Sequence, residues 1–516
     1  MPEPNESARP PNPSADRDRR SGGGRRAGNP TGKPRGKPSG QRSGAEPGSE
    51  GFREQVGVPT RRLALQILIE TDSESQPFVD EALEERLERE DLPWRDRHLL
   101  QEVAYGCLRH RNTLDHLLNQ YLRFPMKQQN LALRWGLRLG AYQVVYLDRI
   151  PVHAAVNGTL EALKSLGSVK EREIGFTNAV LRKLADSLRK KAKEPPQDWR
   201  DPTVIPIRDG FAHFDNVVLP VYGLEPERHL ALKHSHPAWL AKRWIARFGD
   251  QEAAQLCAAG NRIPQVIARV TARSPGFEET RRAIEGASSG EDRPRAEPHG
   301  ERFLVLSHCG DLRALKQIAD GWIQIQDPTA AAIGDALEPP ANARVLDLCS
   351  APGGKAVQLL ERLGPDGSLL ACDVDPTRLE RVTENLSRSG KTNWKTLLVS
   401  ADADALDLGQ KFTHILLDAP CSNTGVLARR PEARWRLRDD ELPNLAARQK
   451  KLLEAAARHL EPKGRLVYAT CSIEPEENGE VAAWAVETLG LRMVDEKLFL
   501  PHRDGGDGGY RAVLER

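Results

Sequence analysis

The sequence predicts a multidomain chain made of an all-helical domain, a small α+β module and a C-terminal doubly wound α/β domain. Between residues 60 and 188, apolar residues recur every four positions, which is the spacing of amphipathic helices. From about residue 345 onward, strand-like and helix-like segments alternate, a pattern typical of a parallel sheet with helices on both faces. At 516 residues, the chain is also too long for one hydrophobic core.

Composition and charge narrow the class of protein. Hydrophobic residues make up 39% of the chain and charged residues 29%, which is ordinary for a soluble protein with a disordered portion. The apolar stretches are too short to span a membrane and the N-terminus has no apolar signal core, so we expect a cytoplasmic monomer without a membrane partner. The formal net charge is only +2, so a nucleic-acid partner would have to bind local basic patches.

Residues 1–57 are rich in Pro, Gly, Ser and Arg and hold almost no apolar residues. Such a segment cannot bury a core, so we expect a disordered basic tail. It would serve either as a solubilising tail or as an arm that touches RNA phosphates nonspecifically, and we prefer the arm.

Residues 58–190 are expected to form an all-helical domain of seven short amphipathic helices whose apolar faces pack together. One such stripe is formed by Val152, Val156 and Leu160. Basic residues beside these stripes are usually solvated helix surface. If this domain binds RNA, four basic side chains are the best placed for it: Arg109, Arg111, Arg182 and Lys183.

Residues 191–235 are Pro-rich, with short β-like pieces at 204–207 and 217–220, and predict a linker or an extended insertion. Residues 236–330 mix helix and strand signals and predict a small α+β module. The sequence shows helical periodicity over 237–257, and predicts a helix over 277–284 and strands over 265–270, 303–306 and 322–326.

Residues 331–516 are expected to form the α/β domain. Asp327 before Pro328 suits the N-cap and first turn of a helix over 329–337. The elements that follow alternate, as a doubly wound sheet requires. They are strands over 345–348, 369–373, 394–399, 412–418 and 465–469, and helices over 377–386 and 442–460.

The first strand of this domain ends in a loop of small residues. Gly353 and Gly354 lack a Cβ, so the backbone can approach a ligand closely. The three-glycine spacing of a dinucleotide-binding loop is absent, and Ala356 stands where a phosphate-binding P-loop needs Ser or Thr. These departures favour an S-adenosylmethionine (SAM) methyltransferase over an NAD-type oxidoreductase, while a plain strand-to-helix turn remains the alternative. The loop offers seven candidate cofactor-binding residues: Cys349, Ser350, Ala351, Pro352, Gly353, Gly354 and Lys355.

Acidic residues follow the next two strands, at the edge of the sheet where ligands bind in doubly wound folds. Asp373 is placed to accept hydrogen bonds from both hydroxyls of a ribose, and Asp402 to accept one from an adenine amino group. An acidic residue at a strand end is often only a helix cap, and Asp375 before Pro376 is a better cap than Asp373.

Seven cysteines are spread along the chain without a C-x-x-C pair, so we expect free thiols and no metal site. Cys421 lies just after the fourth strand, which ends on Asp418, and Cys471 lies just after the fifth. Neighbouring strands would place both thiols in one cleft. A single cysteine is more often a small buried hydrophobe than a nucleophile, but the pair beside Asp418 favours catalysis.

Methylation of carbon 5 of cytosine fits this set of side chains. That carbon is not nucleophilic, so a thiolate must first add at carbon 6 and push electron density onto carbon 5. Asp418 is placed to donate a proton near ring nitrogen 3. After methyl transfer, the carbon 5 proton must leave and the thiol be expelled, which gives the second cysteine a role. The spacing alone does not say which thiol attacks.

The chain resembles the RsmB (Fmu/Sun) family of ribosomal RNA cytosine-5 methyltransferases, within the Nol1/Nop2/Sun group. The matching motifs are Cys349–Lys355, Asp418–Ser422 and Ala469–Ser472, and the resemblance runs from about residue 60 to the C-terminus. It implies SAM as the cofactor and a cytidine of 16S ribosomal RNA as the substrate, free of or early in subunit assembly.

The resemblance also assigns roles to site residues. Cys471 matches the family's nucleophile, and Cys421 matches the cysteine that helps to release the product. The alternatives are a cytosine-5 methyltransferase of another RNA such as transfer RNA, and a non-catalytic RNA-binding ribosome assembly factor. The family pattern assigns cofactor binding to the 349–355 loop, Asp373, Asp402 and Asp418.

Two further segments match the family. The helical region resembles its NusB-like RNA-binding domain, with Asn178–Arg182 among the matching residues. Arg430–Trp435 is similar to the family's loop after the fourth strand and is expected to offer a cation and an aromatic ring near an extruded base. The chain departs from the family in the length of residues 1–57 and 191–235, and in Asp507–Tyr510, which replaces a more aromatic pattern.

Overall fold

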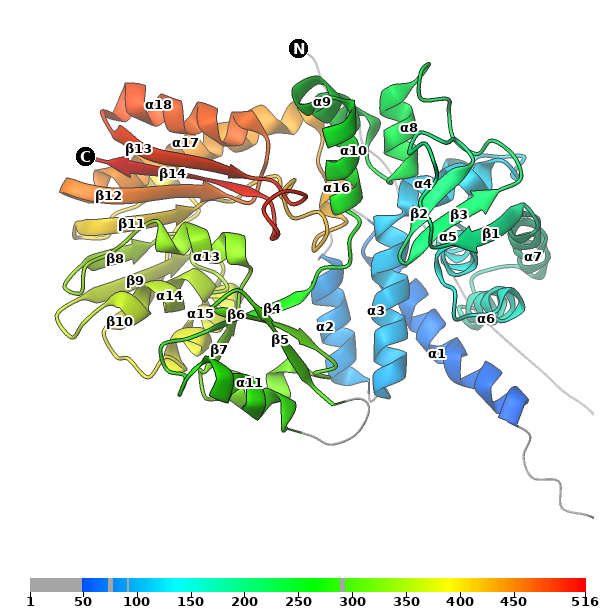
Figure 1. The fold of residues 1–516 in the computed structure, drawn as a ribbon, viewed down its shortest axis with the longest axis horizontal. Helices are drawn as coiled ribbons and strands as arrows, with labels where there is room; N and C mark the ends of the chain where they lie inside the picture. The colour runs from blue at the N-terminus through cyan, green and yellow to red at the C-terminus, as the bar shows by residue number, and fades with distance from the viewer. Residues whose placement is uncertain (1–48, 73–77, 91, 288–292) are drawn as a thin grey trace, which may run out of the picture. The chain divides into compact units, whose positions relative to one another are not determined.

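The computed structural model of the protein describes residues 49–72, 78–90, 92–287 and 293–516 (Figure 1). Most of the tail predicted over residues 1–57 lies outside the described residues, and the described chain begins with α1 (Ser49–Glu70). None of the helices in these ranges is long and apolar enough to cross a membrane.

The N-terminal region is helical, as its apolar spacing predicted. Side chains such as Ile67, Leu100 and Trp135 are fully buried in one shared core. Val156 also faces this core, but the predicted stripe is wrong at Val152, which is 44% exposed because it opens the first turn of its helix. The helices after α1 are α2 (Val79–Arg89), α3 (Trp94–Arg109), α4 (Arg111–Asn119), α5 (Leu131–Tyr146), α6 (Val152–Ser165) and α7 (Glu171–Asp186).

The segment after the helices, expected to be a linker or an extended insertion, forms a three-stranded antiparallel sheet in the order β1-β3-β2. Phe214 and Val218 join the core of the helical domain. The predicted β-like piece at 217–220 is a loop, because the N–H groups of Val218 and Leu219 both donate to the carbonyl of Pro202. The elements are β1 (Leu188–Ala192), β2 (Val204–Ile207), β3 (Gly210–Phe214) and α8 (Pro226–Lys233).

The helical spacing predicted over 237–257 is confirmed. It forms two helices, because Gly249 has φ +80°, a conformation that favours glycine and ends a helix. A four-stranded antiparallel sheet follows in the order β5-β6-β4-β7. The elements are α9 (Ala238–Phe248), α10 (Asp250–Ala259), β4 (Val266–Val270), α11 (Phe277–Glu285), β5 (Arg295–His299), β6 (Phe303–Ser307), α12 (Lys316–Ala319) and β7 (Ile323–Ile325).

The C-terminal domain is the predicted doubly wound sheet, with seven strands in the order β10-β9-β8-β11-β12-β14-β13. Strands β8 to β12 are parallel, and β14 is antiparallel to both of its neighbours. Its strands are β8 (Arg344–Asp347), β9 (Ser368–Asp373), β10 (Trp394–Leu398), β11 (Phe412–Asp418), β12 (Leu460–Thr470), β13 (Arg492–Phe499) and β14 (Gly509–Glu515). Its helices are α13 (Pro328–Asp335), α14 (Gly354–Arg362), α15 (Pro376–Ser387), α16 (Ala433–Arg436), α17 (Leu442–Arg458) and α18 (Gly479–Leu489).

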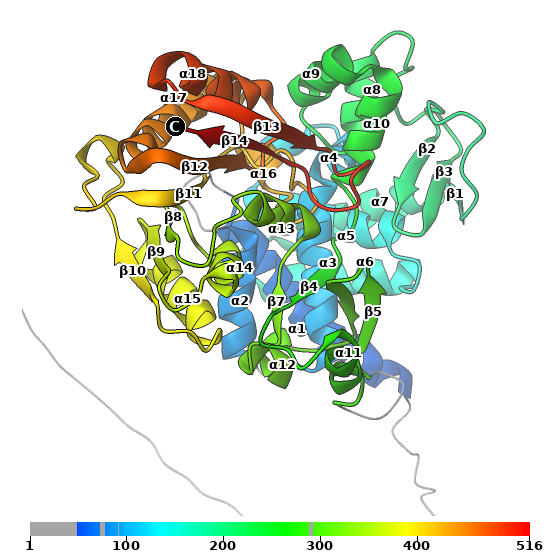
Figure 2. The same ribbon diagram turned by 60° about the vertical axis from the view of Figure 1, so that its left-hand side comes forward.

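Alternate residues of β8 enter hydrophobic cores on opposite faces of this sheet. Val345 packs in one core with Val357 of α14, whereas Leu346 packs in another with Leu453 of α17 and Ala482 of α18. Figure 1 and Figure 2 accordingly show α14 and α15 on one face and α17 and α18 on the other. The order of the strands reverses between β8 and β11, which is where ligands bind in such sheets.

Candidate active site

The two candidate thiols lie side by side at the carboxyl ends of β11 and β12. These strands are parallel, with Asp418 opposite Ala469, so the residues that follow them enter the same crevice. The Sγ atoms of Cys421 and Cys471 are 3.0 Å apart, and both side chains are half-buried. The structure thus brings together two thiols that are 50 residues apart in the chain.

Its contact with the Cys471 sulfur and its burial keep the Cys421 thiol protonated. The neighbouring Cys471 sulfur, together with burial, raises the pKa of Cys421 well above its usual range, because two adjacent thiolates would repel each other in a poorly hydrated site. Cys421 therefore keeps its proton and can donate it in a hydrogen bond to the Cys471 sulfur. Cys372, the next-to-last residue of β9, is also held as a thiol by burial, which raises its pKa to about 12.

A half-buried ion pair joins the first turn of the helix after the glycine loop to the strand that carries Asp418. Lys355 lies in the first turn of α14, and its Nζ donates to Oδ2 of Asp418 at 2.6 Å. Burial opposes the charge on the ammonium group, but the Asp418 carboxylate outweighs it, and the pKa of Lys355 is raised. Asp418 is the more open of the two side chains, at 30% exposure, so its carboxylate is the end of the pair that a ligand in the crevice can reach.

The loop between β8 and α14 is shaped by its small residues. Gly353 has φ +102°, and a Cβ there would lie 3.1 Å from the Cα of Val382 on α15, so both conformation and space demand glycine. The N–H of Ser350 donates to the carbonyl of Cys372 at 2.8 Å. The side chain of Asn385 donates to the carbonyl of Pro352 at 2.8 Å. These two hydrogen bonds therefore fix the loop against β9 and α15.

Asp373 fixes this loop from the end of β9. Its carboxylate accepts hydrogen bonds from three backbone N–H groups, those of Ala351 at 3.2 Å, Val374 at 2.9 Å and Asp375 at 3.2 Å. The side chain is only 4% exposed. As predicted, Asp375 rather than Asp373 caps α15, with its Oδ1 accepting from the N–H of Arg378 at 3.0 Å. The predicted N-cap at Asp327 is also confirmed, with its Oδ1 2.9 Å from the N–H of Thr329.

Asp347, at the end of β8, belongs to the same edge but was not predicted. The hydroxyl of Ser350 donates to its Oδ2 at 2.9 Å, while its buried Oδ1 has no hydrogen-bond partner among the described residues. Burial raises the pKa of Asp347 to about 7. The signal was available in the sequence, since Asp347 ends its strand just as Asp373 and Asp418 end theirs.

These groups fit SAM. The glycine end of the loop leaves room for the cofactor, since a Cβ on Gly354 would meet nothing closer than 3.8 Å. The strand-end carboxylates of Asp347 and Asp373 match the ammonium and ribose hydroxyl groups of the cofactor, which need acceptors. Asp402 lies beyond β10, is exposed and caps a short 3-10 helix over 403–405, with Oδ1 accepting from the N–H of Asp404 at 3.0 Å. Within the described ranges, no His, Cys, Asp and Glu cluster could hold a metal ion.

A buried polar network lies behind the two cysteines, and sequence reasoning missed it. Glu477 is 0% exposed, and its carboxylate accepts from the N–H of Ser422 at 2.9 Å, from the Ser422 hydroxyl and from Nε2 of Gln449 at 2.9 Å. The Ser422 hydroxyl also lies 3.0 Å from the hydroxyl of Ser472. Since Ser422 and Ser472 directly follow the two cysteines, this network ties the two thiol-bearing loops together.

In the loop expected to face a base, Arg430 is exposed, whereas Arg434 and Trp435 make contacts inside the protein. Arg434 is 0% exposed, and burial lowers its pKa to about 9. Its guanidinium donates to the carbonyls of Ser235 and Gly260 at 2.9 and 2.7 Å. The indole N–H of Trp435 donates to the carbonyl of Leu108 at 2.8 Å. Both side chains thus attach the loop to α3 and to the ends of α8 and α10 instead of facing a base.

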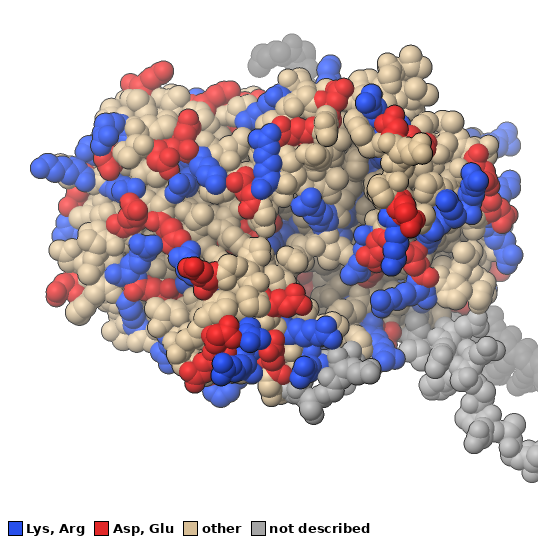
Figure 3. Space-filling model, viewed as in Figure 1, with Lys and Arg blue, Asp and Glu red and all other residues tan. Residues whose placement is uncertain are grey.

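The basic residues expected to contact RNA have different surroundings. Arg109 is only 6% exposed and donates to the carbonyl of Ala428 at 2.9 Å, so it is a structural residue. Arg111 lies 3.6 Å from Asp72. Arg182 and Lys183 are exposed on α7. On the face drawn in Figure 3, basic side chains are interspersed with acidic ones.

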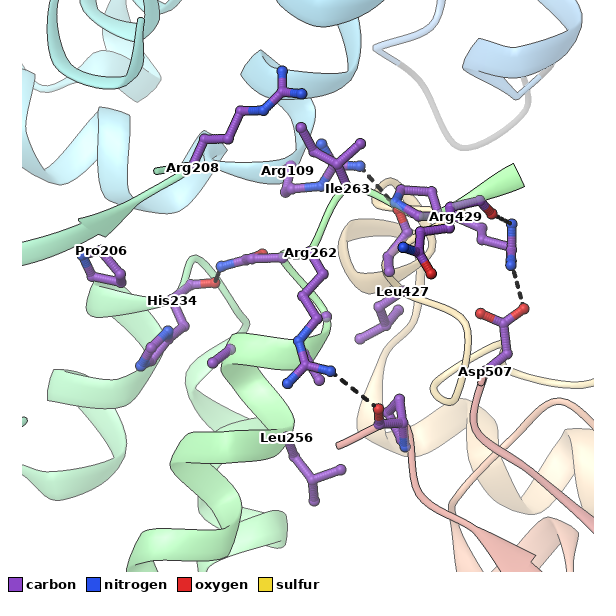
Figure 4. A pocket seen from close by; sticks show the side chains of 18 of the residues that line it. Arg109, Pro206, Arg208, His234, Leu256, Arg262, Ile263, Leu427, Arg429 and Asp507 are labelled. Carbon is purple, nitrogen blue, oxygen red and sulfur yellow. Dashed lines mark hydrogen bonds and ion pairs between the residues drawn. The ribbon is translucent and has the colours of Figure 1, made fainter. Parts of the chain in front are cut away.

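A cavity of about 620 Å³ opens beside the cysteine loops (Figure 4). Thr424 and Gly425 line it on the side of the thiols. Across it, Arg429 is held by Asp507 at 2.5 Å and by Asp327 at 3.0 Å. Further arginines on its wall are Arg109, Arg208 and Arg262.

The unusual Gly508-Gly509 pair has a packing role. Gly508 donates to the carbonyl of Gly425 at 2.9 Å, and Gly425 donates to the carbonyl of Cys471 at 2.9 Å. A Cβ on Gly508 would lie 2.8 Å from the Cα of Gly425, and one on Gly509 would lie 2.8 Å from the carbonyl oxygen of Thr470. The two glycines therefore let the backbone before β14 contact both cysteine loops directly.

Comparison with known proteins matches each part of the chain. Residues 335–515 match the family described as 16S rRNA methyltransferase RsmB/F, residues 58–186 the NusB family, and residues 236–289 the ferredoxin-like domain of RsmF/B-like methyltransferases. Ribosomal RNA small subunit methyltransferase B of Vibrio cholerae is 33% identical over 434 residues, which cover 82% of this chain and 90% of that protein. The same enzyme of Pseudomonas putida is 35% identical over 435 residues, covering 81% and 90%.

Among solved structures, the crystal structure of PH0851 shares the fold with a TM-score of 0.69 at 22% sequence identity, covering 90% of this chain and 98% of that one. The predicted fold class is therefore confirmed, with a NusB-like domain, a ferredoxin-like module and a methyltransferase domain. The match in identity and coverage shows that the chain belongs to the RsmB/F family of SAM-dependent 16S rRNA methyltransferases.

Proposed function

We propose that the protein methylates carbon 5 of a cytidine in 16S ribosomal RNA through a covalent bond between Cys471 and carbon 6. The observation that carries this proposal is the pair of thiols 3.0 Å apart beside the ion pair of Lys355 and Asp418. A methyltransferase that acts on an already nucleophilic atom needs no thiol, whereas carbon 5 of cytosine needs one to activate it. The names of the relatives support small-subunit ribosomal RNA as the substrate.

The cofactor would be held by the 349–355 loop and the carboxylates at the ends of β8 and β9. When bound, SAM supplies an electrophilic methyl group on its sulfonium sulfur. Asp373 would accept the ribose hydroxyls, and Asp347 the ammonium group. Asp402 follows β10, the strand next to that of Asp373, and is proposed to accept a hydrogen bond from the adenine amino group.

The attack begins when the Cys471 proton passes to solvent. The thiolate then bonds to carbon 6, and the electron pair of the carbon 5–carbon 6 double bond shifts into the ring toward nitrogen 3. A proton of Lys355, whose Nζ lies 2.6 Å from Oδ2 of Asp418, passes through the Asp418 carboxylate to that nitrogen. Lys355 is left neutral and Asp418 is left ionised. The ring now carries the electron density at carbon 5 that methyl transfer requires.

Release uses the other thiol. After methyl transfer, the carbon 5 proton passes to solvent and its electron pair re-forms the carbon 5–carbon 6 double bond. The bond between carbon 6 and Cys471 breaks, and the electron pair stays on sulfur, where the S–H of Cys421 stabilises the thiolate by hydrogen bonding. Nitrogen 3 returns its proton through Asp418 to Lys355, which restores the ion pair. The high pKa of Cys421 supports its part as the protonated partner in both steps.

The RNA would approach from the side of the helical domain. The cavity beside Thr424 and Gly425 is within the size range of binding pockets and adjoins the thiol loops. Exposed basic residues such as Arg182 and Lys183 could meet phosphates elsewhere on that domain, where contacts give affinity without sequence information.

The test is bisulfite sequencing of ribosomal and transfer RNA from a strain that lacks the gene, complemented with wild type, Cys471→Ser or Cys309→Ser. Cys309 is a matched control, because it is also a half-buried thiol but lies in the ferredoxin-like module. In the strain that lacks the gene, we expect one 16S cytidine to lose its carbon 5 methyl group. Only the wild-type protein and Cys309→Ser should restore this methyl group. Loss of a mark in transfer RNA alone would change the substrate, and an unchanged set of marks would contradict the enzymatic proposal.

A further inference from the structure

Asn423 contacts both cysteines of the site through one amide group. Its Nδ2 donates to the backbone carbonyl of Cys421 at 2.9 Å, and its Oδ1 accepts from the Sγ of Cys471 at 3.3 Å. The amide is therefore held at one end by the backbone of one cysteine and meets the thiol of the other. None of the reaction steps described above uses this residue.

The backbone of Asn423 adopts an uncommon conformation to make these contacts. Its φ is +63°, in the left-handed region that most L residues avoid and that glycine adopts at little cost. Asparagine tolerates this region better than most side chains, but glycine would still be the simpler choice. An outlier of this kind beside reactive groups suggests that the side chain itself is used.

The contacts fix the direction of the hydrogen bonds in the thiol pair. The Oδ1 atom of Asn423 can only accept, so the Cys471 S–H must donate to it. The Cys471 sulfur is then free to accept the S–H of Cys421 across the 3.0 Å contact. The three groups form a chain of hydrogen bonds that runs from Cys421 through Cys471 to Asn423.

We infer that Asn423 is a positioning residue that orders the two thiols, so that Cys471 is the one that loses its proton and reacts. The inference rests on the proposed function, because ordering matters only if one thiol attacks and the other assists. When the Cys471 proton leaves, the Cys421 S–H already points at the sulfur and stabilises the thiolate. Without the amide, the Cys471 S–H can turn toward Cys421 instead, and the two sulfurs can exchange roles.

The matched pair of variants is Asn423→Gly and Lys463→Gly. Lys463 has the same φ of +63° but is exposed near the start of β12, at the end of the strand opposite to the thiols. Both substitutions remove a side chain from a left-handed position and let glycine keep the backbone, so both proteins should fold. Thermal unfolding of each variant checks this directly.

The first readout needs no RNA. Iodoacetamide alkylates a thiolate by forming an S–C bond as iodide leaves, and peptide mass spectrometry reports how much of each cysteine has reacted. In wild type and Lys463→Gly, we expect Cys471 to be alkylated at least about tenfold faster than Cys421, since the thiolate is the reacting form. In Asn423→Gly, we expect this preference to fall toward equal labelling, and the pH profile of Cys471 alkylation to shift.

The second readout is single-turnover methylation of 16S ribosomal RNA. For Asn423→Gly, we expect the rate to fall by about 10- to 100-fold, the effect of a misplaced reacting group, with no change in KM for RNA. The inference would be overturned if Asn423→Gly kept the same preference for alkylation of Cys471 as wild type. It would also be overturned if the two thiols of wild type were alkylated equally fast. If wild type methylates no cytosine while the labelling preference depends on Asn423, the proposed function fails and the ordering of the thiols stands.

Discussion

Lys355 Nζ lies 2.6 Å from Asp418 Oδ2, so a single ion pair connects the cofactor loop to the strand that leads into the thiol site. Lys355 lies in the first turn of α14, which follows β8, and Asp418 ends β11, the strand next to β8. A change in the cofactor loop therefore reaches the Asp418 carboxylate, which is proposed to act on the cytosine ring.

Replacement of Lys355 by Met should lower methylation and stability together. Asp418 would keep its charge without a cation, and the loss of a hydrogen bond between charged groups costs about 1.5–3 kcal/mol. Urea unfolding and single-turnover methylation measure the two effects. Lys451→Met is the control, since its pairing with Asp404 is exposed on both sides and such pairs contribute about 0–1 kcal/mol. Equal effects of the two substitutions would contradict a special role for the Lys355 pair.

Replacement of Asp373 by Asn should weaken SAM binding. The carboxylate accepts three backbone N–H groups and is proposed to accept the ribose hydroxyls, whereas an amide has only one oxygen to do so. A loss of about 1.5–3 kcal/mol corresponds to an increase in Kd of about 10- to 150-fold, measurable by calorimetry. Asp375→Asn is the control, because Asn caps a helix as well as Asp does. Unchanged affinity in Asp373→Asn would move the ribose contact elsewhere.

The strand-end rule explains which parts of the site could be predicted. Ligands bind at the carboxyl ends of parallel strands, and this rule located Asp373, Asp418 and the two thiols from the sequence. The rule applies equally to Asp347, which ends β8. The hairpin of β13 and β14 gave weaker signals, because β13 carries Arg, Asp, Glu and Lys on exposed positions.

Tertiary contacts explain what could not be predicted. Glu477 meets Ser422 across 55 residues of chain, and nothing in the local pattern of Glu477 indicates that its carboxylate is buried. Arg434 and Trp435 were interpreted as base contacts because cations and aromatic rings suit that role. Burial against α3, α8 and α10 decides otherwise, and burial of this kind depends on how distant segments pack.

The pKa of Asp347 predicts a pH dependence of stability. Burial raises this pKa to about 7, against about 3.9 in an unfolded chain, so the folded protein holds the proton more tightly. The resulting stabilisation is fully present below about pH 4 and is lost as the pH rises to about 7, at no more than about 1.4 kcal/mol per pH unit.

Replacement of Asp347 by Asn should remove this dependence. We expect the free energy of unfolding of Asp347→Asn to exceed that of wild type at pH 8, with the difference shrinking toward pH 5. Urea unfolding at several pH values measures it, in the absence of SAM. A difference that does not change with pH would mean that Asp347 is already ionised in the folded protein at pH 5.

Replacement of Glu477 by Gln should impair catalysis without contacting the substrate. One carboxylate oxygen would become an NH2 group that faces the donors of Ser422 or Gln449, and each lost bond to a charged acceptor costs about 1.5–3 kcal/mol. The loops of Cys421 and Cys471 would then lose their common anchor. We expect a lower kcat with little change in KM for RNA. Glu480→Gln, at an exposed position of α18, should behave as wild type, and a Glu477→Gln enzyme with full kcat would show that the network is dispensable.

The last prediction separates the two thiols in the reaction itself. If Cys471 attacks carbon 6, Cys471→Ser should form no covalent RNA complex, because a hydroxyl without a matched base is a much weaker nucleophile than a thiolate. If Cys421 assists the departure of Cys471, Cys421→Ala should still attack and methylate but release slowly, since the S–H that stabilises the leaving thiolate at 3.0 Å is gone. Denaturing gels with labelled RNA should therefore show a shifted band for Cys421→Ala and none for Cys471→Ser, with Cys309→Ser as the control. The reverse pattern would make Cys421 the nucleophile, and the inference that Asn423 selects Cys471 would fail with it.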